Sequence, residues 1–221
     1  MEQCVLDHLV VTAPSLSAGA EFVERELGVA MQPGGEHSRM GTHNLLLRLG
    51  DAAYLEVISI NPYAPNPGRP RWFALDHPDT MTQPGLCTWV ARTSSIREAL
   101  SANREDLGPV EVMSRGDMEW HITTPSDGRP PLDGTVPALI QWPSGRHPAS
   151  TLPDAGCTFL RLEAYHPDPA RVSAVIDCLG LHDSICVRPL PPGVRGYLAA
   201  YINTPTGQRC IATPSRRPDR L

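Results

Sequence analysis

A helix-like stretch that ends in a leucine–glycine pair recurs three times in this 221-residue chain. The pairs are Leu27-Gly28, Leu107-Gly108 and Leu179-Gly180, and they lie 80 and 72 residues apart. Glycine commonly ends a helix because it adopts the left-handed backbone conformation of the C-terminal cap without strain. A short apolar run precedes each stretch, and two or three more follow it. Such a repeat restricts the chain to folds that are built from one supersecondary unit.

Each of the three stretches has the cap and the apolar spacing of an amphipathic helix. Ser15 can cap the first, Ser94 or Ser95 the second, and Asp168, followed by Pro169, the third. Apolar residues then recur every three or four positions, as they do where one face of a helix packs on a sheet. We therefore expect three helices whose apolar stripes belong to the core.

Strand-like runs surround these helices and give the order β-α-β-β-β three times. They cover residues 4–11, 30–36, 44–49 and 53–58, then 86–91, 110–114, 118–123 and 138–142, and finally 158–164, 185–189, 197–202 and 208–212. The segment 61–70 contains too many prolines for regular structure and predicts a connector. We expect an α+β protein with βαβββ modules at residues 1–60, 71–148 and 156–214.

Composition excludes several classes of function. All 19 basic residues are arginine, so no lysine is present for Schiff-base chemistry, for anchoring pyridoxal phosphate or for a P-loop. The net charge of -5 and the lack of a basic stripe argue against a nucleic-acid partner. No apolar run approaches the roughly 20 residues of a membrane span, and the N-terminus lacks the pattern of a signal peptide. The sequence therefore predicts a cytoplasmic protein without a nucleic-acid or membrane partner.

Several segments resemble the vicinal oxygen chelate superfamily, and within it the glyoxalase-like domain proteins. The first strand reads LDHLVV (6–11), the third is contained in GTHNLLLRLG (41–50) and the fourth reads YLEVI (54–58). The second unit adds LIQW (139–142) followed by His147-Pro148. The likeness extends to about Pro214.

This resemblance implies that paired βαβββ modules curve into an open barrel around a ligand cavity. Modules one and two then form one glyoxalase-like domain, with the third βαβββ-like unit outside it. An odd number of modules leaves one sheet edge unpaired, which suggests a homodimer. The superfamily contains lyases, isomerases and dioxygenases that act on small oxygenated molecules, but also metal-free binding proteins. Both an enzyme and a protein that sequesters a small molecule are therefore open.

The resemblance places His8 and Glu56 at the two strand positions where superfamily enzymes hold a divalent metal. Imidazole and carboxylate donors suit Zn, Fe, Ni, Co or Mn. Strand alternation puts Glu56 on one face with Tyr54 and Ile58, and a carboxylate among apolar neighbours needs a partner. In the second unit, Gln141 or, with a shift of one residue, Ile140 matches Glu56, and Gln141 is the expected third ligand. Without a metal, His8 and Glu56 would act as catalytic base and hydrogen-bond partner.

Four further residues complete the expected ligand-binding set with Gln141. His43 and His121 lie on the third strands of their units, and Asn44 can donate to a ligand oxygen. Trp72 follows the connector and can cover the cavity. Each has an ordinary structural alternative, such as a core histidine, a turn cap or an aromatic plug of the core.

Overall fold

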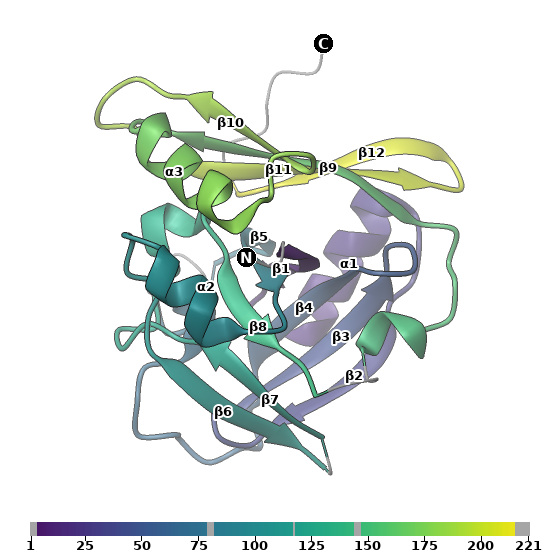
Figure 1. Cartoon of the computed structure of the whole chain (residues 1–221). Coiled ribbons are helices and arrows are strands. Elements are labelled where there is room, and N and C mark those ends of the chain that lie inside the picture. Colours follow the sequence, from purple (N-terminus) through teal and green to yellow (C-terminus); the bar gives the residue numbers. More distant parts are fainter. Residues whose placement is uncertain (1–3, 79–81, 117, 144–146, 215–221) are drawn as a thin grey trace.

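Two stacked β-sheets form the body of the protein (Figure 1). The computed structural model of the chain describes residues 4–78, 82–116, 118–143 and 147–214. The larger sheet has eight strands in the order β2-β3-β4-β1-β5-β8-β7-β6, and the smaller has four in the order β10-β9-β11-β12. In the described part of the chain, no helix has the length and apolar character that crossing a membrane requires.

The eight-stranded sheet is built by two units with the same pairing. The first consists of β1 (Val5–Thr12), α1 (Leu16–Leu27), β2 (Gln32–His37), β3 (Thr42–Arg48) and β4 (Tyr54–Ile60). The second consists of β5 (Gly85–Arg92), α2 (Ile96–Ala102), β6 (Val110–Arg115), β7 (Met118–Thr123) and β8 (Ala138–Gln141). In each unit the fourth strand pairs parallel with the first. The antiparallel pairing of β1 with β5 then joins the units into one sheet.

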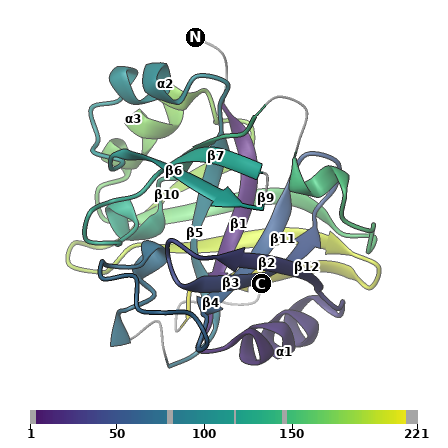
Figure 2. The same cartoon turned by 90° about the horizontal axis from the view of Figure 1, so that it is seen from below.

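This sheet curves until its two edge strands approach each other (Figure 2). An ion pair crosses the seam between the edges: Arg39, after β2, places Nη2 2.9 Å from Oε2 of Glu111 on β6. The α+β fold with tandem βαβββ modules in a curved open barrel is thereby confirmed.

The third unit keeps the element order but not the strand pairing. It consists of β9 (Thr158–His166), α3 (Pro169–Leu179), β10 (Ile185–Pro189), β11 (Tyr197–Thr204) and β12 (Gly207–Ala212). Here β9 pairs parallel with β10 on one side and antiparallel with β11 on the other. Because both sides of β9 are occupied within its own unit, β9 cannot pair with the first strand of another unit as β1 does with β5. The unit therefore forms a separate sheet.

Two of the three predicted glycine caps end their helices. Gly28 and Gly180 have positive φ angles of 73° and 69° directly after α1 and α3. The second helix ends earlier than expected, at Ala102, and Gly108 lies in a later turn. Ile96 is the only residue that α2 buries, whereas Leu107 packs into the core from the loop. A helix that buries so little surface gains little stability from additional turns.

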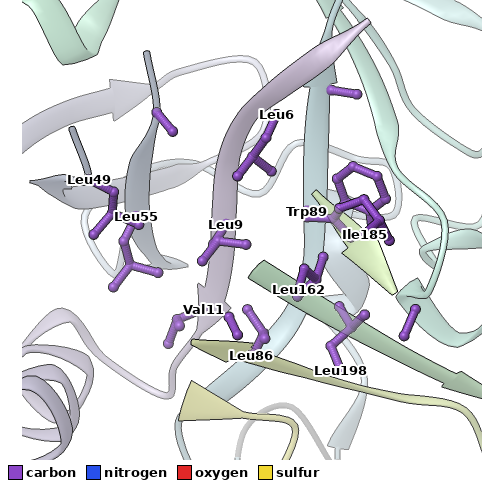
Figure 3. Packing of buried hydrophobic residues seen from close by; sticks show 14 of the residues in the cluster. Leu6, Leu9, Val11, Leu49, Leu55, Leu86, Trp89, Leu162, Ile185 and Leu198 are labelled. Carbon is purple, nitrogen blue, oxygen red and sulfur yellow. The ribbon is translucent and has the colours of Figure 1, made fainter. Parts of the chain in front are cut away.

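The main hydrophobic core lies between the two sheets. Leu9 and Val11 of β1 and Trp89 of β5 contribute the outer face of the larger sheet, and Leu162 and Leu198 contribute the smaller one (Figure 3). A second apolar cluster occupies the concave face of the larger sheet and includes Val10, Ile58 and Trp120. The third unit thus covers one face of β1 and β5 and leaves the other face for a cavity.

Two leucines on β9 test this packing with the same substitution. Leu162 is fully buried between the sheets, whereas Leu160 is 43% exposed. Leu162→Ala should lower the free energy of unfolding by about 2–5 kcal/mol, because it leaves a cavity in the core. Leu160→Ala should change it by less than about 0.5 kcal/mol. Urea unfolding of both variants measures the difference, and equal losses would contradict the proposed core.

Candidate active site

A bulge in β1 turns two consecutive side chains to the concave face of the larger sheet. Leu6 pairs with Ala91 of β5 and His8 with Val90, so Asp7 is an extra residue in the register. Side chains normally alternate between the faces of a strand, but a bulge places neighbouring residues on one side. Asp7 and His8 are both buried there.

Asp7 accepts hydrogen bonds from three side chains. Its Oδ1 lies 2.7 Å from Nδ1 of His8, and its Oδ2 lies 2.9 Å from Nε1 of Trp142 and 3.0 Å from Nε2 of His147. Burial opposes ionisation, but the hydrogen bonds from His147 and His8 outweigh it and hold the pKa of Asp7 well below its usual value. Because an ionised carboxylate only accepts, Nδ1 of His8 is the donor, and Nε2 faces the cavity.

Glu56 on β4 faces His8 across the cavity floor. Its Oε2 lies 3.6 Å from Nε2 of His8, which is longer than a hydrogen bond. Its Oε1 accepts a hydrogen bond of 2.5 Å from Nδ2 of Asn44, whose Oδ1 accepts one of 2.7 Å from the backbone N–H of Gly35. A continuous polar chain therefore runs from Asp7 through His8 and Glu56 to Asn44. Within this series of polar side chains, the gap between Nε2 of His8 and Oε2 of Glu56 is the one place where a proton or a reacting atom fits.

Aromatic side chains enclose this pair. Tyr54 stacks on His8 with ring centroids 4.6 Å apart, and burial raises the pKa of its hydroxyl well above the usual value. Trp72 and Phe73 come from the short helix η1 (Trp72–Ala74), where Phe73 and Ala74 have positive φ angles. A backbone conformation with positive φ costs about 1–3 kcal/mol for each residue other than glycine, and it often marks a binding site. Here it brings two consecutive aromatic rings into the cavity wall.

The space between these side chains is small. The cavity has a volume of about 30 Å³, which is room for one or two water molecules. Larger clefts of about 760 and 640 Å³ lie along the connector and between the two sheets. Of these three spaces, only the small cavity is lined by His8 and Glu56. A ligand of several hundred cubic ångströms requires side chains at its mouth to move.

The structure brings together four of the predicted site residues: His8, Glu56, Asn44 and Trp72 all line the cavity. Their roles stay predictions. Asp7, Tyr54, Trp142 and His147 join the site without having been predicted. Trp142 and His147 stood in the segments that carried the resemblance, whereas Asp7 was hidden because simple alternation places it opposite His8.

The structure does not bring His43, His121 and Gln141 to the cavity. His43 alternates with Asn44, and His121 lies between two cavity-lining residues of β7, so both histidines occupy the opposite face of the sheet. Oε1 of Gln141 accepts a hydrogen bond of 3.0 Å from the backbone N–H of Ile96. Ser95, one of the two expected caps, makes no side-chain hydrogen bond there. Gln141 therefore caps α2 by accepting a hydrogen bond from a backbone N–H group of its first turn.

The donor set that remains does not fit a resident metal ion. His8 Nε2 and Glu56 Oε2 face each other, but the amide oxygen of Asn44 is already bound to Gly35. Within residues 4–78, 82–116, 118–143 and 147–214, no three His, Cys, Asp or Glu side chains come together as ligands. Catalytic sites commonly supply three protein ligands. The site with His8, Glu56 and Gln141 as ligands is thus not formed.

Comparison with known proteins agrees with this architecture. The family described as "Glyoxalase-like domain" matches residues 6–180. No curated protein sequence gives a significant match. A hypothetical protein from Staphylococcus aureus superposes with a TM-score of 0.56 at 14% identity, over 79% of this chain and 74% of the other. This match shows a shared fold.

Two structures of methylmalonyl-CoA epimerase give weaker superpositions. The Streptomyces coelicolor protein, in complex with 2-nitronate-propionyl-CoA, has a TM-score of 0.43 at 14% identity, over 65% of this chain and 100% of its own. The Mycobacterium tuberculosis protein has a TM-score of 0.39 at 17% identity, over 62% and 87%. We draw no conclusion about activity from either.

Protonation of His37 should destabilise the protein in acid. His37 lines the cavity, and its burial lowers its pKa from 6.5 to about 4. Because the folded state binds this proton less readily than the unfolded state, the contribution to stability is complete above pH 6.5 and is lost as the pH falls toward 4. His37→Gln should remove this part of the acid dependence in urea unfolding, whereas substitution of the exposed His182 by Gln should not. An unchanged dependence in His37→Gln would contradict the assignment.

Removal of the charge of Asp7 should weaken the fold at neutral pH. Asp7→Asn should lower the free energy of unfolding by about 3 kcal/mol, because three donors lose an ionised partner. The depressed pKa makes this contribution present above the ordinary value of 3.8 and progressively lost below it. Urea unfolding should therefore show a large difference from the wild type at neutral pH and a smaller one in acid. Asp51→Asn, at a side chain that is 95% exposed, is the control.

Proposed function

The chain belongs to the glyoxalase-like domain family of the vicinal oxygen chelate superfamily, and we propose that it is an enzyme that transfers a proton on a small oxygenated molecule. The observation that supports this most strongly is the buried pair of His8 Nε2 and Glu56 Oε2, 3.6 Å apart, with His8 oriented by an ionised Asp7. A base held in one tautomer inside an enclosed cavity is suited to proton abstraction. The proposal favours isomerase or lyase chemistry.

His8 is the proposed base. Its Nε2 accepts a proton from a carbon next to a carbonyl group, and the C–H electron pair moves into the carbonyl to form an enolate. The imidazolium that results lies between the carboxylates of Asp7 and Glu56, which stabilise its positive charge. In an isomerase that acts on a hydroxycarbonyl compound, the hydroxyl proton of the first carbon moves to the enolate oxygen, and Nε2 returns its proton to the former carbonyl carbon. In a lyase, the electron pair of the enolate expels a leaving group from the carbon next to the deprotonated one.

Glu56 and the aromatic wall set the conditions for this step. The hydrogen bond from Asn44 fixes one oxygen of Glu56, so the other stays directed at His8. Tyr54, Trp72 and Trp142 limit the access of water, and charges interact more strongly in such an environment than in water. The substrate is thereby held close to the base in an environment that favours proton transfer between them.

A binding protein without chemistry is the second candidate. The ring pairs Trp72–Phe73 and Trp120–Trp142, each with centroids 5.3 Å apart, resemble the wall of a site that sequesters an apolar or planar ligand. In that case His8 and Glu56 would serve as hydrogen-bond partners. For either candidate, we propose that the protein is cytoplasmic and forms a homodimer.

Hydrogen–deuterium exchange at carbon tests the proposed enzyme. The protein is incubated in D₂O with 2-oxobutanoate, 3-hydroxy-2-butanone or dihydroxyacetone, and loss of the proton signal next to the carbonyl is followed by NMR. We expect accelerated exchange of at least one compound. His8→Gln should slow it by at least about 100-fold, because the base is lost. Glu56→Gln should slow it less.

The control is His121→Gln. Because His121 is half-buried on the opposite face of the sheet, this variant should catalyse exchange as fast as the wild type. Exchange that persists unchanged in His8→Gln would refute the assignment of the base. Binding of these compounds without any exchange would favour the second candidate.

A further inference from the structure

One arginine at the cavity has no anionic partner among the residues that the structure describes. Arg115, at the end of β6, is half-buried and lines the cavity that contains His8 and Glu56. Across the described residues, its guanidinium forms no hydrogen bond or ion pair within 4 Å. Two other arginines of the same seam, Arg39 and Arg69, both bind Glu111, at 2.9 and 2.6 Å. Within the described ranges, Arg115 thus differs from Arg39 and Arg69 in that its guanidinium has no carboxylate partner.

Two glycines on the opposite edge strand make room for this side chain. A Cβ atom on Gly35 would lie 2.5 Å from Cδ and 3.1 Å from Nη1 of Arg115, and one on Gly34 would lie 2.0 Å from Oδ1 of Asn44. Neither glycine has a positive φ angle, so space rather than backbone conformation requires them. Gly34 and Gly35 therefore let Arg115 lie across the seam while Asn44 stays bound to Glu56.

The charge of Arg115 acts inside the cavity. It lowers the pKa of the buried His37 and opposes the rise in the pKa of Tyr54. The cavity wall otherwise contains the carboxylate of Glu56, with that of Asp7 buried behind His8, and both would repel an anionic ligand. A planar guanidinium with free donors binds a carboxylate through two parallel hydrogen bonds, and its positive charge offsets this repulsion.

We propose that Arg115 is the specificity-determining residue of this site and binds a carboxylate of the substrate, so that the substrates are small 2-oxo acids and related carbonyl acids. This rests on the proposed function for the location of the chemistry. Because the cavity holds only about 30 Å³, the ligand must displace a side chain at its mouth. The stem of Arg115 is flexible and spans the seam, so its movement admits the ligand and its charge then holds it.

Isothermal titration calorimetry with two probes of the same shape tests the proposal. 2-Oxobutanoate carries the carboxylate, and 2-oxobutanamide replaces it with a neutral amide. The wild type should bind the acid at least about tenfold more tightly than the amide. Arg115→Gln should abolish this preference, and Arg115→Lys should keep part of it, because lysine is a point charge without a fork. Arg39→Gln, which loses a charge at the same seam, should keep the full preference.

A second variant tests the position of the guanidinium without removing its charge. Gly35→Ala should displace Arg115 and weaken binding of the acid, while binding of the amide changes little. Circular dichroism checks that each variant is folded. Equal binding of acid and amide by the wild type, no binding of the acid at millimolar concentrations, or a preference that survives in Arg115→Gln would each overturn the proposal.

The same titrations in His8→Gln separate this proposal from the proposed function. If the acid preference persists in His8→Gln but the wild type exchanges the carbon-bound proton of no compound, the carboxylate site stands and the proton transfer fails. If exchange occurs with acid and amide alike and depends on His8 but not on Arg115, the proton transfer stands and the carboxylate site fails.

Discussion

The buried carboxylate of Asp7 is the interaction on which the site depends. A buried charge is costly unless hydrogen bonds compensate it, and Asp7 receives them from His8 of its own strand and from Trp142 and His147 of the second unit. The same group therefore ties the two halves of the barrel together and fixes the tautomer of His8. A bulge of one residue makes this possible, because it turns Asp7 toward the cavity rather than the core.

The two faces of the central strands β1, β4 and β5 differ in what they contact. Leu9, Val11 and Trp89 on the outer face pack against the sheet of the third unit, and the concave face holds the polar chain. All side chains described as lining the cavity lie between residues 8 and 148, so β9 to β12 take no direct part in the site. The third unit contributes by burying the back of the strands that carry His8 and Glu56, which keeps their positions fixed.

In the second unit, two polar strand residues make structural hydrogen bonds instead of lining the cavity. Thr88 of β5 donates to the carbonyl of Gly134, and Gln141 of β8 accepts from the backbone N–H of Ile96, whereas Ile140 is the β8 residue that lines the cavity. The polar pair at the cavity floor, His8 and Glu56, therefore comes entirely from the first unit. At the seam, Arg115 supplies the one cationic fork that lines the cavity in the described part of the chain, which makes the site suited to a carboxylate.

Local patterns in the sequence determined the α+β class, the three repeated units, the caps at Ser15 and Asp168 and the shared face of Tyr54, Glu56 and Ile58 on their strand. These follow from backbone preferences and from strand alternation, which depend on near neighbours in the chain. Only the tertiary structure decided the bulge at Asp7, the changed strand order around β9, the capping role of Gln141 and the reach of Arg115 across the seam. Each of these depends on pairing or close contact between segments far apart in the sequence, and residue spacing alone contains no information on such contacts.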